Sequence, residues 1–175
     1  MRTQMLRAWA LLSLLGGLTL AVGCKREDDC HGDTCACSGG EECYMTCSDD
    51  GCRQSCSNLQ RCGGACHADD CQFSCTQLSE CSSYCEKNCQ IDCRNTQTCS
   101  AICGPGCDYR CDMVDNCGVE VGPDSRVVCN QVGDCDVVCN GACEVLLTGV
   151  GGHSVECANG FVKAERGGLA TCTAL

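Results

Sequence analysis

The sequence predicts an all-β protein, a parallel β-solenoid of short strands with about 18 residues per coil, cross-linked by disulfides. Eight CxxxC units start at residues 43, 52, 62, 71, 81, 89, 99 and 107. Two successive units with their connections form a repeat of 18 or 19 residues that carries four cysteines. The residues inside the units alternate in polarity, and turn-forming residues separate the units.

The alternation inside each unit favours a strand over a helix. Two cysteines four residues apart share one face of either element, so the residues between them decide. The flanking positions are mainly polar, as in Arg53 and Ser55, whereas five of the eight central residues are large or apolar. This period of two indicates strands. The central residues, which we expect to face a core, are Met45, Gln54, Gly64, Phe73, Ser83, Ile91, Ala101 and Tyr109.

The connections between the units are short and polar. They hold three to five residues, such as SDDG at 48–51 and GPG at 104–106, which are typical of turns. A five-residue unit between such turns is too short for a stable helix. Short strands at a fixed period predict coils whose inward side chains stack on one another.

Beyond Cys111 the rhythm continues, with aliphatic residues in place of many cysteines. β-branched residues are frequent here, which favours strands. We therefore expect residues 118–175 to be a Gly- and Val-rich continuation, with a C-terminal cap, of the domain formed by the CxxxC repeats at 43–117. The expected strands are 117–121, 126–129, 135–139, 143–147, 153–157, 161–164 and 169–173.

The two strands of one coil would run in opposite directions across a thin core. The last cysteine of one unit then faces the first cysteine of the next, which predicts nested disulfides. The predicted pairs are Cys47–Cys52 inside Cys43–Cys56, Cys66–Cys71 inside Cys62–Cys75, Cys85–Cys89 inside Cys81–Cys93, and Cys103–Cys107 inside Cys99–Cys111. A frame shifted by one unit, with Cys56–Cys62 inside Cys52–Cys66, fits nearly as well, and spacing does not fix connectivity. Disulfide-clamped helical hairpins and an irregular disulfide-rich fold stay open as alternatives.

Residues 1–23 have the features of an export signal. Arg2 and Arg7 precede an apolar stretch at 8–22, which is shorter than the roughly 20 residues that a membrane-spanning helix needs. The stretch ends in LAVGC at 20–24, which resembles the lipobox of bacterial lipoproteins. The resemblance implies that Cys24 carries a lipid as the first residue of the mature chain and anchors it to a membrane. The polar residues that follow predict a lipid-anchored tether over 24–42.

The same resemblance implies a location in the bacterial cell envelope. Lys25 stands where an Asp would retain such a lipoprotein in the inner membrane, so we expect the outer membrane or the cell surface. The number of cysteines agrees with lipidation. The chain has 27, and without Cys24 there remain 26, enough for 13 disulfides with no cysteine left over.

Charge and composition restrict the possible functions. Loss of Arg2 and Arg7 leaves ten basic residues against 23 acidic ones, a net charge of −13. Such a chain repels phosphate, so we expect no nucleic acid partner. Aromatic residues are 3% of the chain, too few to offset chain entropy by apolar burial alone. Disulfides, worth roughly 2–4 kcal/mol each and nearer 2 for short loops, must supply part of the stability.

The sequence contains no recognisable catalytic motif, which predicts a non-enzyme without a cofactor. It has no GxSxG, no CxxC and no phosphate-binding loop. The acidic turns lack calcium-loop spacing, and CxC occurs once, at 35–37, so we assign no metal site. We expect a rigid structural or adhesive scaffold that binds a protein or a glycan. The alternative is a metal-binding or thiol-buffering envelope protein, whose cysteines would be free or metal-bound.

Overall fold

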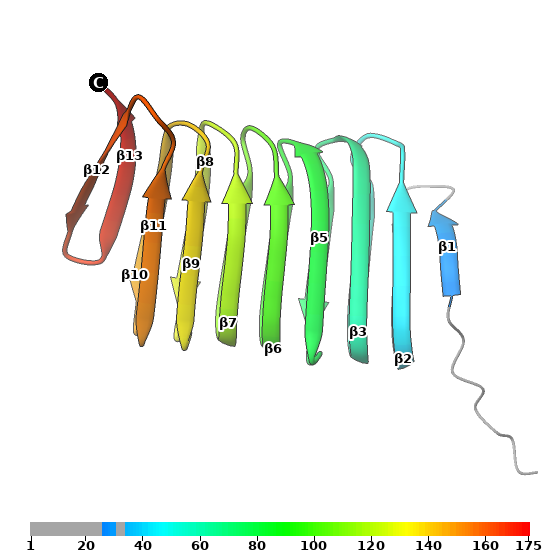
Figure 1. The fold of residues 1–175 in the computed structure, drawn as a ribbon. Helices are drawn as coiled ribbons and strands as arrows, with labels where there is room; N and C mark the ends of the chain where they lie inside the picture. The colour runs from blue at the N-terminus through cyan, green and yellow to red at the C-terminus, as the bar shows by residue number, and fades with distance from the viewer. Residues whose placement is uncertain (1–25, 31–33) are drawn as a thin grey trace, which may run out of the picture.

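The computed structural model describes residues 26–30 and 34–175, and every regular element in them is a β-strand. The strands stack into a parallel β-solenoid of about seven coils, spaced about 18 residues apart (Figure 1). The predicted fold class is therefore confirmed, and the described part of the chain contains neither helical hairpins nor any helix able to span a membrane.

Thirteen strands make up this part of the chain. They are β1 (Arg26–Cys30), β2 (Thr34–Cys47), β3 (Arg53–Asp69), β4 (Gln72–Thr76), β5 (Glu80–Lys87), β6 (Gln90–Cys103), β7 (Asp108–Val121), β8 (Ser125–Asn130), β9 (Asp134–Cys139), β10 (Cys143–Thr148), β11 (Gly152–Cys157), β12 (Phe161–Arg166) and β13 (Leu169–Ala174).

The parallel registers define two faces. The front face, which is nearest the viewer in Figure 1, consists of residues 43–47, 62–66, 81–85, 99–103, 117–121, 135–139 and 153–157. The rear face consists of residues 34–37, 53–57, 72–76, 90–94, 108–112, 125–130 and 143–148. Equivalent cysteines pair in register from coil to coil, as Cys43 with Cys62 and Cys62 with Cys81.

The two edges that join the faces differ. At one edge, the arc edge, the chain passes from the rear to the front face, and β2, β3, β6 and β7 bend through it without a break. These strands therefore have 14 to 17 residues, where the sequence predicted separate five-residue units. At the opposite edge, the turn edge, short turns such as 104–107 and 122–124 interrupt the strands.

With the exception of the turn at 140–142, the bends that the structure describes between the two faces contain a residue with a left-handed backbone. On the arc edge these residues recur every 18 or 19 positions: Gly39, Asn58, Gln77, Asn95, Met113, Gln131 and Gly149, with φ between 50° and 71°. On the turn edge they are Gly51, Asp70, Asn88, Gly106, Asp124 and Gly160. Gly, Asn and Asp tolerate this conformation best, which explains their recurrence in the connections.

Inward side chains of the two faces are complementary in size. The rear face contributes the large residues Phe73, Ile91 and Tyr109, all at most 5% exposed. The front face contributes small residues opposite them. A Cβ on Gly64 would lie 2.4 Å from a ring carbon of Phe73, so only Gly leaves room for this ring. Further along, both faces contribute valines, among them Val137, which is 1% exposed. The predicted inward positions are therefore confirmed, and the core is one pair of side chains thick.

A hairpin closes the C-terminal end of the solenoid. β12 and β13 pair antiparallel, and β13 also pairs antiparallel with β10 (Figure 1). Their strand positions match the sequence expectation, whereas their direction departs from the parallel pattern. Because β13 occupies the free edge of β10, the hairpin prevents a further parallel strand from pairing there.

The predicted tether at 24–42 is partly wrong. Residues 26–30 form β1 and residues 34–42 form the first part of β2, so the solenoid begins before Cys43. The reason is that Cys37 already stands in register with Cys56, one coil later. The signal segment 1–23 and Cys24 lie outside the described residues.

Met113 provides a test of the left-handed column. It has φ 54° and is 48% exposed, so its side chain gains little packing in return for the strained backbone. We expect Met113→Asn to raise the free energy of unfolding by roughly 0.5–1 kcal/mol, because Asn adopts this conformation at lower cost. Denaturant unfolding of the disulfide-bonded protein, followed by far-UV circular dichroism, measures the change.

Val138→Asn is the matched control. Val138 is 38% exposed and lies inside β9, outside the left-handed columns. There the same replacement removes a β-branched residue from a strand and should lower stability. Equal effects of the two substitutions would contradict the explanation based on backbone conformation.

Candidate functional site

Two columns of disulfides run along the two edges of the solenoid. The arc-edge ladder consists of six bonds with a sequence separation of 6: Cys37–Cys43, Cys56–Cys62, Cys75–Cys81, Cys93–Cys99, Cys111–Cys117 and Cys129–Cys135. The turn-edge ladder consists of Cys47–Cys52, Cys66–Cys71, Cys85–Cys89, Cys103–Cys107 and Cys139–Cys143. Cys157–Cys172 joins the cap to β11, and Cys35 is disulfide-bonded as well.

Four of the eight disulfides predicted from the sequence are present in the structure. The structure contains the four inner pairs, Cys47–Cys52, Cys66–Cys71, Cys85–Cys89 and Cys103–Cys107. The four outer pairs, Cys43–Cys56, Cys62–Cys75, Cys81–Cys93 and Cys99–Cys111, are wrong, because each of these cysteines bonds across the arc edge to its neighbour in sequence.

The physical reason is that both edges bring neighbouring cysteines together. Each arc-edge bond closes over six residues, with Cα atoms 6.3–6.5 Å apart, a separation that disulfides span. In a CxxxC unit, the first cysteine thus bonds to the preceding unit and the second to the following one, as Cys43 bonds to Cys37 and Cys47 to Cys52. The predicted outer pairs would have joined the same two arc-edge columns one coil out of step, and the Sγ atoms of Cys81 and Cys93 do lie within 4.8 Å of each other.

The ladders place three sulfur atoms close together at several levels. Cys81, Cys93 and Cys99 are buried with their Sγ atoms within 4.8 Å of one another, and Cys117, Cys129 and Cys135 repeat the arrangement. Cys139, Cys143 and Cys172 form a third cluster. All these sulfurs are disulfide-bonded in the structure, and only thiolates are strong metal ligands. The clusters become a possible soft-metal site only if the bonds are reduced.

One disulfide is absent from the turn-edge ladder. Val121 and Ser125 occupy the positions between the Cys103–Cys107 and Cys139–Cys143 bonds, at the same sequence separation of 4. Val121 is fully buried, and the Ser125 Oγ accepts a 3.0 Å hydrogen bond from the Cys107 backbone N–H. A hydrogen bond therefore links neighbouring coils where the covalent bond is absent.

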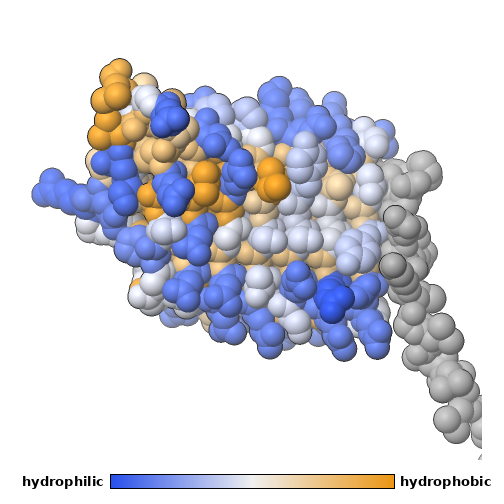
Figure 2. Space-filling model, viewed as in Figure 1, coloured by the Kyte–Doolittle hydropathy of each residue, from blue (hydrophilic) through white to orange (hydrophobic). Residues whose placement is uncertain are grey.

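Charged side chains gather along the edges. Arg61 lies between Glu42 and Glu80 in one row, and Lys87 donates a 2.9 Å hydrogen bond to Asp69, which raises the pKa of the Lys87 ammonium group. These groups are exposed, so their ion pairs contribute little to stability. Figure 2 shows hydrophilic residues along both edges of the front face and a paler band between them.

The front face holds a shallow trough of about 410 Å³ over β2, β3 and β5. Its lining contains no charged residue: two tyrosines, Tyr44 and Tyr84, stand among Met, Thr, Ser, Ala and Gly. On the rear face, a cavity of about 370 Å³ is lined by polar and charged groups, including Arg53 and Asp92. Neither surface was predicted from the sequence.

Two buried hydroxyl groups have no hydrogen-bond partner in the part of the chain that the structure describes. They are the Ser83 Oγ and the Tyr109 Oη. Burial raises the pKa of the Tyr109 phenol, so the group stays protonated. Tyr109 faces the core, whereas Ser83 also contributes to the lining of the trough.

Comparison with known proteins returns no relative: no family model, curated protein or solved structure matches the chain. The fold and the two ladders by themselves define a rigid, disulfide-rich solenoid scaffold.

Completing the turn-edge ladder tests its geometry. The double variant Val121→Cys/Ser125→Cys should form an additional disulfide, because the bonded pairs on either side have the same separation and Cα distances of 6.1 Å. Closing so short a loop contributes about 2 kcal/mol, from which the loss of the Ser125 hydrogen bond subtracts about 1 kcal/mol. Intact mass after alkylation detects the bond, and denaturant unfolding measures the net gain.

Two single variants are the controls. Val121→Cys should show one free thiol after denaturation, and Ser125→Ala should show only the cost of the lost hydrogen bond. Two free thiols in the double variant would show that the edges do not align as the structure describes.

Proposed function

We propose that this protein is a cell-envelope lipoprotein that acts as a rigid structural or adhesive scaffold, without enzymatic activity. The observation that carries the proposal is the pair of disulfide ladders, which close a loop at nearly every bend of the chain. Such loops of four to six residues leave the coils little freedom to unwind. A binding or adhesive surface benefits from this rigidity because less ordering entropy is lost on association.

The N-terminal sequence supports lipid anchoring. Cys24 ends the lipobox-like segment, and only Lys25 separates it from β1. A lipid on Cys24 would therefore hold the β1 end of the solenoid at the membrane, with the β12–β13 hairpin at the far end (Figure 1). The acidic charge gives no electrostatic attraction to anionic lipids, so the lipid would provide the attachment.

The disulfides support an exported protein, since such bonds persist in oxidising compartments and are rare in the cytosol. We place the protein at the outer membrane or cell surface, with a protein or a glycan as its partner. Its role would need neither a cofactor nor a metal.

The three-sulfur clusters favour a second candidate, a metal-binding or thiol-buffering envelope protein. The two functions differ in the state of the same cysteines. A scaffold needs them paired, whereas metal ligation and thiol buffering need them as free thiols or thiolates.

Thiol counting separates these functions. The exported chain, alkylated under denaturing conditions before reduction, should take up no adduct on residues 25–175. After reduction it should take up 26 adducts, the number of cysteines left when Cys24 is set aside. Mass spectrometry and metal analysis of the same sample give both readouts. Many adducts before reduction, together with stoichiometric metal, would establish the metal-binding function instead.

Lipidation is tested separately. When the full chain is expressed in a bacterium fed an alkyne-labelled palmitate analogue, it should become labelled and partition with membranes. Cys24→Ala should abolish the label while the disulfides still form. An equally labelled Cys24→Ala chain would contradict the assignment of Cys24, and an unlabelled wild-type chain would contradict lipid anchoring.

A further inference from the structure

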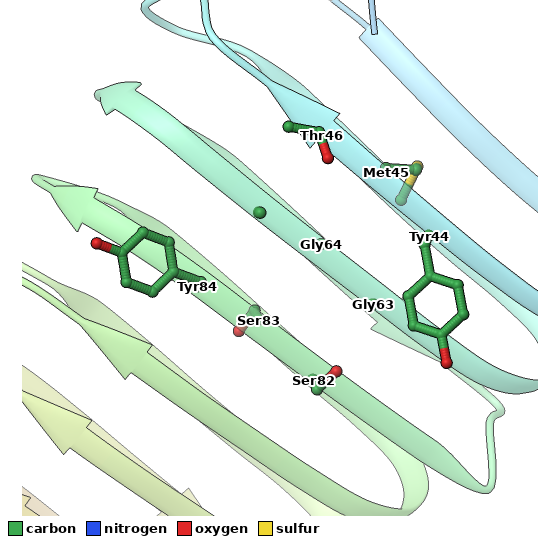
Figure 3. Close-up of a pocket in the computed structure, with 9 residues that line it drawn as sticks. Tyr44, Met45, Thr46, Gly63, Gly64, Ser82, Ser83 and Tyr84 are labelled. Carbon is green, nitrogen blue, oxygen red and sulfur yellow. The ribbon is translucent and has the colours of Figure 1, made fainter. Parts of the chain in front are cut away.

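We propose that the front-face trough between Tyr44 and Tyr84 is a binding site for a neutral polysaccharide, recognised by stacking of sugar rings on the two tyrosines. The inference rests on the proposed scaffold function and names the ligand that the front face of the solenoid would bind. Figure 3 shows the two tyrosines at opposite ends of the trough, with Gly63 and Gly64 on the strand between them.

The register places the two rings diagonally across three coils. Tyr44 stands beside Gly63, which stands beside Ser82, and Thr46 and Ala65 lead in the same way to Tyr84. The tyrosines thus occupy opposite corners of a block of six outward positions whose other members are all small. At the usual strand and residue spacings, their Cα atoms are about 12 Å apart, a span that an oligosaccharide of a few units covers.

Neighbouring residues hold both rings in place. A Cβ on Gly63 would lie 2.5 Å from the Tyr44 Cδ1, so this ring packs directly over the glycine, yet Tyr44 stays 40% exposed. Tyr84, also 40% exposed, packs against the His67 ring with centroids 5.5 Å apart. His67 in turn lies 3.5 Å from Glu86. Each tyrosine is therefore supported on one side and accessible on the other, with little freedom left to lose on binding.

The polar groups of the trough suit an uncharged, hydroxylated ligand. Tyr44, Thr46, Ser82 and Tyr84 give the lining four outward hydroxyl groups, and no charged residue lines the trough. Hydroxyls both donate and accept hydrogen bonds, as sugar hydroxyls do.

Charge excludes the acidic alternatives. The chain carries a net charge of −11, and the row that borders the trough on the arc edge, Glu42, Arg61 and Glu80, has one more negative than positive charge. A polyanion such as an acidic polysaccharide would be repelled there. The aromatic rings supply apolar contact for the C–H faces of a neutral pyranose, and the glycines let the ligand approach the strand backbone closely.

The test uses the full chain, exported, lipidated and solubilised in a polyoxyethylene detergent that has no sugar headgroup. Cellohexaose, chitohexaose and maltohexaose are the neutral probes, and hexagalacturonate is the acidic one, all measured by isothermal titration calorimetry. At least one neutral probe should bind with a Kd below about 1 mM, and hexagalacturonate should not bind.

Variants then locate the site. Tyr44→Ala and Tyr84→Ala should each weaken binding by about tenfold, whereas Tyr44→Phe and Tyr84→Phe, which keep the ring, should weaken it by less than about threefold. Gly63→Ala should also weaken binding, because the new methyl group displaces the Tyr44 ring. Val162→Ala, at a 46% exposed position on the C-terminal hairpin, is the control and should bind like the wild type.

Failure of all three neutral probes, equal binding of hexagalacturonate, or unchanged binding by both Tyr→Ala variants would overturn the inference. Thiol counting and lipid labelling involve no saccharide. A chain that passes both tests but binds no probe therefore contradicts the saccharide site alone and leaves the scaffold function standing.

Discussion

A solenoid whose two faces are separated by a single pair of side chains has little apolar volume to bury, and this constraint determines much else in the molecule. Inward positions at the strand ends are occupied by cysteine, and the bonds between them replace the missing apolar contacts. The central position of each strand then needs only to fill the space between two disulfides. This explains why residues as different as Gly64, Phe73 and Tyr109 occupy equivalent places, provided that a large residue faces a small one.

The same constraint leaves the outer surface free to vary. Because cysteines and inward residues hold the backbone, outward positions on the front face can be as small as Gly63 or as large as Tyr84 without a cost to the core. Around the trough the charged residues lie at the edges, as Arg61 and Lys87 do, whereas further along Glu120 and Asp136 stand on the front face itself. The result is a trough over β2, β3 and β5 that no charged residue lines, on an otherwise acidic molecule.

Period and polarity predicted the fold, because the alternation around Ile91 or Val137 favours strands, although they left helical hairpins and an irregular disulfide-rich fold open as alternatives. Connectivity was beyond the sequence, because Cys56 has plausible partners in both directions and only the bend at the arc edge selects Cys62. The start of the solenoid before Cys43 was not predicted, because the residues there are polar and contain Gly. The cysteine spacing was the available signal, since Cys37 stands one 19-residue coil before Cys56. The trough went unseen because Tyr44 and Tyr84 lie two coils apart.

Pairing between neighbours in sequence has a consequence for how such a chain can evolve. The segment 90–107 carries two complete bonds, Cys93–Cys99 and Cys103–Cys107, and no cysteine inside it depends on one outside. Duplicating or deleting such an 18-residue block would leave every remaining cysteine with its partner. With nested disulfides, fewer positions in the chain would allow a block to be duplicated or deleted without separating bonded cysteines. The solenoid can therefore be lengthened or shortened by tandem duplication or deletion of such blocks without a new folding problem.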